Sequence, residues 1–142
     1  MTADQNGLSI GLRASVSAEV TEADTAAALG SGDVPVLGTP RLLALAEAAS
    51  VAAVAPRLAP GQTTVGTAVS LEHRRPIPLG TQIEVEAELT EIDGRRLVFM
   101  FIGYGPGVGD AAVIGAGTVE RVVLDRERFL ARAGQMPVVD RG

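Results

Sequence analysis

A nearly uninterrupted apolar stretch from Leu42 to Val54 constrains this 142-residue chain more than any other feature. It holds only leucine, alanine and valine apart from one serine and one glutamate, Glu47. Thr39 and Pro40 precede it in the pattern of a helix start, because a threonine hydroxyl can cap free amides and proline needs no donor there. A helix that is apolar on all sides is typically buried. We therefore predict a long central helix with a carboxylate inside it.

Residues 62–73 follow with the alternation of a strand that ends at His73, the only histidine of the sequence. The more apolar of its two faces comprises Val65, Thr67, Val69, Leu71 and His73. We expect this face to pack on the helix. Because an ionised carboxylate is costly to bury without a partner, Glu47 and His73 on a common layer suggest an acid–base pair.

The remaining pattern predicts one antiparallel sheet. The expected elements are a strand over 7–20, a short helix over 21–29, a Gly/Ser-rich loop over 30–38, strands over 82–92, 96–104 and 112–124, and a helix over 126–133. Asp93 and Gly94 predict a two-residue hairpin. This order indicates the α+β class and a hotdog fold, in which a curled antiparallel sheet wraps around one long buried helix. We expect a single domain over 1–142, with 1–6 and 134–142 loose.

Composition excludes several functions. The net charge of −5 and the 3% aromatic content argue against nucleic acid as a partner. The absence of cysteine excludes disulfides and thiolate ligands, and a single histidine argues against a zinc site, so no metal is expected. No signal peptide or membrane span is apparent, which predicts a cytoplasmic protein that does not bind a membrane. The open edge of the sheet predicts a homodimer.

Three polar residues point to a family. Thr39, Glu47 and His73, with Gly66 between the last two, resemble the fluoroacetyl-CoA thioesterase family of hotdog proteins in spacing and in element order. The similarity extends over residues 36–129. It includes the segments EAASVAAVAPRLAPG, VGTAV, DGRRL, GAGTVER and LDRERF.

The resemblance implies hydrolysis of an acyl-CoA thioester by a Thr–Glu–His set. Thr39 would attack the carbonyl or position a water, and His73 would act as base and then as acid. Glu47 would orient His73 or attack in its own right. No metal or redox cofactor is implied, since coenzyme A is part of the substrate. Residues 26–38 lack the aromatic side chains that shape a fluoroacetate-selective lid. We therefore expect another short or medium acyl group.

Each implied residue has an alternative structural interpretation. Thr39 could be an ordinary N-cap, and the Gly66 amide could bind the thioester carbonyl or merely mark a bulge. Arg74 and Arg75 could bind the CoA phosphates or be solvated. We interpret Arg121, beside Glu120, as part of a surface or interface ion pair.

Helix geometry raises a question about the site. Eight helical residues rise about 12 Å, so Thr39 and Glu47 cannot touch in one straight helix. Either Thr39 folds back, or substrate and His73 bridge the two, or a second subunit contributes. Two other functions remain open: a non-catalytic hotdog protein that binds acyl-CoA or another small ligand, and a hydratase acting on enoyl thioesters.

Overall fold

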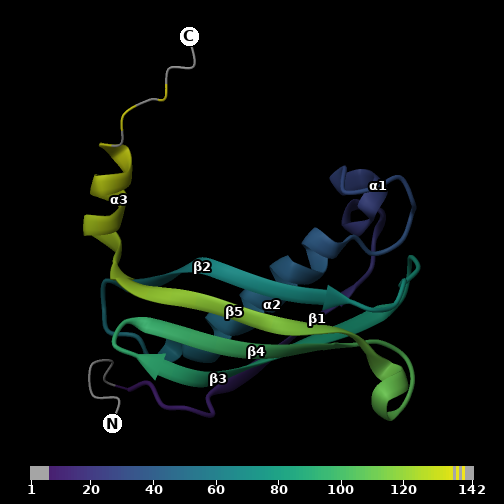
Figure 1. Cartoon of the computed structure of the whole chain (residues 1–142), viewed down its shortest axis with the longest axis horizontal. Helices are drawn as coiled ribbons and strands as arrows, with labels where there is room; N and C mark the ends of the chain where they lie inside the picture. The colour runs from purple at the N-terminus through teal and green to yellow at the C-terminus, as the bar shows by residue number, and fades with distance from the viewer. Residues whose placement is uncertain (1–6, 136, 138, 140–142) are drawn as a thin grey trace.

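The computed structural model describes residues 7–135, 137 and 139. In chain order it contains β1 (Arg13–Glu19), a 3-10 turn (Glu22–Asp24), α1 (Ala26–Leu29), α2 (Thr39–Val54), a 3-10 turn (Ala55–Arg57), β2 (Gln62–His73), β3 (Gln82–Asp93), β4 (Arg96–Tyr104), a 3-10 turn (Gly109–Ala112), β5 (Val113–Asp125) and α3 (Arg126–Gly134). The five strands form one antiparallel sheet in the order β1-β3-β4-β5-β2 (Figure 1). The predicted α+β hotdog fold is confirmed. Helix α3 extends to Gly134, and the predicted loose ends lie mostly outside the described residues.

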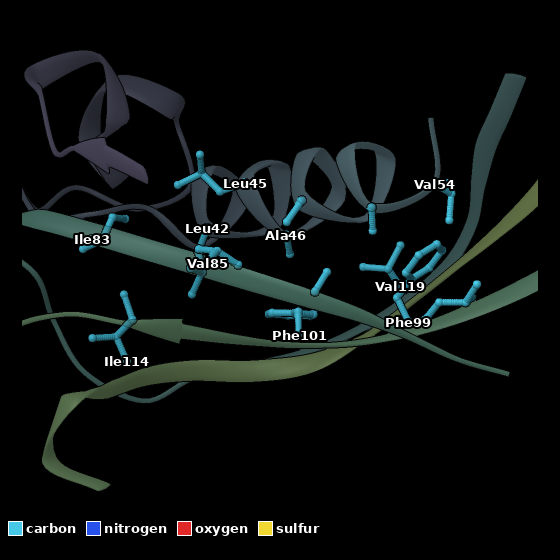
Figure 2. Packing of buried hydrophobic residues seen from close by; sticks show 14 of the residues in the cluster. Leu42, Leu45, Ala46, Val54, Ile83, Val85, Phe99, Phe101, Ile114 and Val119 are labelled. Carbon is cyan, nitrogen blue, oxygen red and sulfur yellow. The ribbon is translucent and has the colours of Figure 1, made fainter. Parts of the chain in front are cut away.

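The core lies between α2 and the sheet. Figure 2 shows helix residues such as Leu42 and Ala46 directed at sheet residues such as Phe101 and Val85. All four side chains are at most 1% exposed. Burial of a large apolar side chain stabilises the folded state by about 1.5–3 kcal/mol, and the alanines of α2 allow helix and sheet to approach closely. This packing fixes the axis of α2 relative to β2 and β5, which carry the polar site residues.

The prediction that α2 is buried on all sides is wrong for a single chain. Ala44, Ala48 and Val51 are exposed, and Glu47 between them has a side chain that is 38% exposed. These positions are spaced i, i+3, i+4 and i+7, so they form one stripe along the helix. The physical reason is that the sheet of one chain covers only one side of α2. A carboxylate is therefore held at the margin of the core and is not sealed inside it.

The predicted face of β2 is also wrong in its first half. A bulge between Gly66 and Ala68 inserts one residue into the pairing with β5. Before the bulge Thr64 and Gly66 face the helix, and Val65 faces the opposite side; after it Leu71 and His73 face the helix. A bulge shifts the alternation of a strand by one residue, which regular alternation cannot anticipate.

The hairpin between β3 and β4 is displaced by one residue from its predicted position. Asp93 and Arg96 form the last pair, and Gly94 and Arg95 make the turn. Gly94 has the positive φ (59°) that favours glycine in a tight hairpin. Strand β4 lies between β3 and β5 and is therefore a central strand of the sheet. Within the described residues no helix has the length and apolar character needed to span a membrane.

Candidate active site

The start of α2 directs the Thr39 hydroxyl toward β2. The N-cap is Gly38, not Thr39, which corrects the alternative N-cap interpretation of the threonine. A Cβ at Gly38 would lie 3.0 Å from Leu29 and 3.1 Å from the backbone of Ala26, so the packing of α1 requires a glycine there. Thr39 is the first helical residue, and its Oγ1 lies 2.8 Å from His73 Nδ1. The hydroxyl is thus engaged with the imidazole and not with the helix backbone.

His73 is the last residue of β2 and is half-buried. Desolvation by burial lowers the pKa of His73 below its ordinary value, and the nearby backbone of Arg75 opposes this shift. The imidazole is therefore neutral at pH 7, and its Nδ1 can accept a proton from Thr39. Its buried Nε2 has no hydrogen-bond partner among the described residues.

A cavity of about 280 Å³ lies beside this pair. Its lining comprises Ala26, Ser31, Val34, Val36, Leu37, Thr39, His73, Arg74, Arg75 and Pro76. Two backbone hydrogen bonds hold the loop that lines the cavity: the N–H of Leu37 donates to the carbonyl of Ile77 (2.8 Å), and the N–H of Ala26 donates to the carbonyl of Val36 (2.8 Å). The cavity therefore combines a small aliphatic wall with the Thr39–His73 pair and two arginines.

The fall in rate at acid pH should report the protonation of His73. Because the resemblance implies that the neutral imidazole acts as the base, and because burial lowers the pKa of His73, we expect kcat/KM to stay nearly constant above about pH 6.5. It should fall tenfold per pH unit only once the pH is below the lowered pKa. Initial rates between pH 4.5 and 9 give this profile. A limb above about pH 6.5 would contradict the proposed state of His73.

Glu47 belongs to a second polar cluster. Arg121 Nη1 donates to Glu47 Oε2 at 3.1 Å, Arg121 Nε donates to Thr64 Oγ1 at 2.9 Å, and Nη2 donates to the Thr64 carbonyl at 3.1 Å. The Arg121 side chain is 8% exposed. Burial lowers the pKa of Arg121 while the charge of Glu47 raises it, and a guanidinium remains protonated throughout. Glu47 is thus held in one orientation by a buried cation.

Arg121 is the residue whose role the sequence interpretation missed. Its partner is Glu47, and the neighbouring Glu120 instead pairs with Arg96 at 2.8 Å. A usable signal exists in the sequence, because Val119, Arg121 and Val123 alternate on one face of β5. A cation in a row of buried valines requires a buried acid, and Glu47 is the only acid of the central helix.

Gly66 leaves room for the Glu47 carboxylate. A Cβ at this position would lie 2.6 Å from Glu47 Oε2 and 3.4 Å from Arg121 Nη1. Gly66 also flanks the bulge, so that interpretation of this glycine is confirmed, and the binding of a thioester carbonyl by its amide stays a prediction. The close approach of the carboxylate is the feature that excludes a side chain.

Replacing Gly66 by alanine should therefore displace the carboxylate while leaving the fold intact. A shift of about 1 Å in a catalytic group can lower the rate about 10²-fold, and we expect kcat/KM to fall on this scale. Gly134→Ala is the matched control, since a Cβ there meets nothing within 4 Å. Steady-state rates and thermal melts of both variants test the prediction. Wild-type activity in Gly66→Ala would show that the position of the carboxylate is unimportant.

Within one chain the two clusters stay apart. Thr39 and His73 contact each other and line the cavity with Arg74 and Arg75. Glu47, with Gly66, makes its contacts to Arg121. Among residues 7–135, 137 and 139, no group of three histidine, aspartate or glutamate side chains could hold a metal ion.

Comparison with known proteins identifies the family. The sequence pattern of the fluoroacetyl-CoA-specific thioesterase family, FlK, matches residues 20–127. The chain belongs to this family. The fluoroacetyl-CoA thioesterase of Streptantibioticus cattleyicolor is 39% identical over 100 residues, which are 70% of this chain and 69% of that protein. The resemblance inferred from Thr39, Gly66, Glu47 and His73 is confirmed at the level of the family, and the chain is an acyl-CoA thioesterase of the FlK family.

Solved structures agree with this assignment. A Thr→Ser mutant of FlK in complex with acetyl-CoA is 32% identical and superposes with a TM-score of 0.80, covering 90% of this chain and 98% of that one. A hot-dog-like protein from Thermanaerovibrio acidaminovorans is 18% identical with a TM-score of 0.81, covering 92% and 94% of the two chains, and supports the fold alone. The FlK-family assignment and the hotdog fold therefore rest on independent comparisons.

Proposed function

We propose that this protein hydrolyses a short or medium acyl-CoA thioester with Thr39, His73 and Glu47 as its catalytic set. The observation that carries the proposal is the 2.8 Å contact between Thr39 Oγ1 and His73 Nδ1 at the wall of a cavity. A hydroxyl within hydrogen-bond distance of a neutral imidazole is the arrangement of an activated nucleophile.

The reaction proceeds in two steps on this pair. Thr39 Oγ1 attacks the thioester carbonyl while its proton moves to His73 Nδ1; the C–S bond then breaks, and the imidazolium returns the proton to the departing thiolate. Water, deprotonated by His73, next attacks the threonyl ester; the bond from the acyl carbon to Thr39 Oγ1 breaks, the imidazolium returns the proton to Oγ1, and the acid is released. The Gly66 amide of a second copy of the chain is proposed to stabilise the developing oxyanion. Glu47 is assigned the orienting role, because its ion pair with Arg121 makes it a poor nucleophile.

A second copy of the chain is proposed to complete the site. Three features support a homodimer through β2: the strand lies at the sheet edge, its residues 66–70 are exposed, and the exposed stripe of α2 around Glu47 flanks the same edge. Long open edges are rarely left unpaired. In addition, His73 Nε2 is buried without an acceptor among the described residues. An N–H there would donate to a carboxylate across the interface, as in other nucleophile–imidazole–carboxylate sets.

The register of such a dimer follows from the faces of β2. In an antiparallel pair of identical strands, the two-fold axis makes every contact reciprocal. Because the bulge adds one residue between Gly66 and Ala68, an axis through Ser70 places Val69 opposite the partner's Leu71 and Gly66 opposite the partner's His73, with all of them on the helix side. Glu47 contacts Gly66, so the same axis brings the carboxylate of one protomer toward the imidazole of the other. Thr39 and Glu47 lie about 12 Å apart along one helix, because eight helical residues rise that far. In the proposed dimer the two residues need not meet within one chain, since the partner's Glu47 is the one that approaches His73.

The cavity indicates the acyl group. Its volume of about 280 Å³ is at the small end for ligand pockets, and the wall formed by Ala26, Val34, Val36 and Leu37 is aliphatic. Among the residues that the structure describes, no aromatic side chain lines it. We assign it to a short or medium aliphatic acyl chain, with fluoroacetyl disfavoured. Arg74 and Arg75 line the same cavity, and Arg75 has no ion pair within the described residues, so we propose them as contacts for CoA phosphates.

Thiol release from a panel of acyl-CoA thioesters tests the proposal. We expect the protein to hydrolyse acetyl- to hexanoyl-CoA. We also expect it not to hydrolyse fluoroacetyl-CoA in preference to acetyl-CoA. Intact-mass measurement after rapid quenching should detect an acyl adduct that Thr39→Ala lacks. Binding of acyl-CoA without thiol release would replace the hydrolase by a binding protein. A strong fluoroacetyl preference would overturn the assignment of the acyl group.

A further inference from the structure

A second hollow lies on the opposite face of the sheet from the Thr39–His73 cavity. It measures about 650 Å³ and runs between α3 and the outer surface of β2 and β5. Val65, Val122, Leu124 and Phe129 supply its apolar lining. Phe129 is 37% exposed, and nothing in the proposed reaction uses this groove.

Three arginines surround the groove. They are Arg95 from the β3–β4 turn and Arg128 and Arg132 from α3. Within the described residues none of the three forms an ion pair, although the chain carries a net charge of −5. The acidic lining residue Asp125 caps α3 by accepting from the backbone N–H of Arg128. The groove is therefore a basic, partly apolar surface that fits an acidic protein segment.

The position of α3 indicates which segment that is. In Figure 1 helix α3 (yellow) leaves the end of β5 and stands beyond β2, on the side where the sheet edge is open. A second copy of the chain paired through β2 would therefore lie next to α3. The axis through Ser70 also places Ala68 and the bulged residue Thr67, which lines the groove, opposite the partner's Glu72. The Glu72 side chain is 75% exposed; its Oε1 pairs with Arg74, and its Oε2 makes no hydrogen bond among the described residues.

We infer that α3 clasps the second protomer, with Arg128 and Arg132 binding Glu72 of the partner subunit. This inference rests on the proposed β2 dimer and adds a second, outer contact to it. Opposite charges that become partly desolvated across an interface attract more strongly than exposed pairs do. The two-fold axis makes the contact occur twice, once at each end of the paired strands.

Sedimentation equilibrium of the full chain tests the clasp. We expect Arg128→Glu/Arg132→Glu to raise the dimer dissociation constant about tenfold or more, and added Glu72→Arg to restore much of the loss. Arg126→Glu/Arg57→Glu is the matched control, because it makes the same charge change outside the groove. Circular dichroism verifies folding of each variant.

Four outcomes would overturn the clasp. They are a wild-type monomer, equal weakening by the test and control variants, no rescue by Glu72→Arg, and unchanged dimerisation with lost CoA binding. The last outcome would make the groove a small-anion site.

The proposed reaction is judged separately by thiol release in the same variants. A dimeric, active Arg128→Glu/Arg132→Glu protein removes only the clasp, whereas an inactive wild type removes the reaction.

Discussion

Mixing two inactive variants, Glu47→Gln and His73→Ala, is expected to restore thiol release to about a quarter of the wild-type rate, because random exchange makes half of the dimers mixed and each mixed dimer has one intact site. In the proposed dimer that site takes His73 from one chain and Glu47 from the other. Each variant alone should lose about 10²–10⁴-fold in kcat/KM, the usual contribution of a general base and its positioned partner.

The experiment distinguishes the two possible locations of the carboxylate. If Glu47 served the His73 of its own chain, every site in the mixture would carry one defect and the activity would stay at background. The two proteins are mixed under mild denaturation and refolded, and rates are compared with unmixed samples treated in the same way. A mixture of His73→Ala with Thr39→Ala should show no rescue, because these two residues contact each other within one chain.

Replacing Glu47 by alanine is expected to destabilise the protein by about 2–3 kcal/mol, because it leaves the buried Arg121 cation without its counter-charge. This lies below the range for fully buried pairs, since the Glu47 side chain is 38% exposed and water can reach the guanidinium from that side. Glu47→Gln should cost only about 1 kcal/mol, because the amide oxygen still accepts from Arg121. Urea unfolding followed by circular dichroism measures both values.

The double variant Glu47→Ala/Arg121→Met is the control for this interpretation. Removing both charged groups should be less harmful than removing Glu47 alone, since no unpaired cation then remains. The expected order of stability is wild type, Glu47→Gln, the double variant and Glu47→Ala. A Glu47→Ala protein as stable as Glu47→Gln would mean that the hydrogen bond from residue 47 to Arg121 contributes nothing, and one as stable as the wild type would mean that solvent already offsets the Arg121 charge.

Local patterns in the sequence were sufficient for the fold and for half of the site. The apolar stretch of α2, the alternation of β2 and the turn residues act over a few positions, so the central helix, the strands and the hotdog arrangement could be predicted from them. The same local spacing placed Thr39 at the helix start and His73 at a strand end. The two residues come into contact because α2 begins where β2 ends in space.

Contacts between residues far apart in sequence were decided only by the tertiary structure. The bulge at Gly66 changed which residues of β2 face the helix. Because Gly38 is the N-cap of α2, the Thr39 hydroxyl does not cap the helix and can contact His73. The pairing of Arg121 with Glu47 joins positions separated by 74 residues. Such pairings depend on how strands register and how closely helix and sheet pack, which periodicity does not encode. The sequence by itself therefore determined the elements and the reactive residue types, and the packed chain decided which of those residues meet.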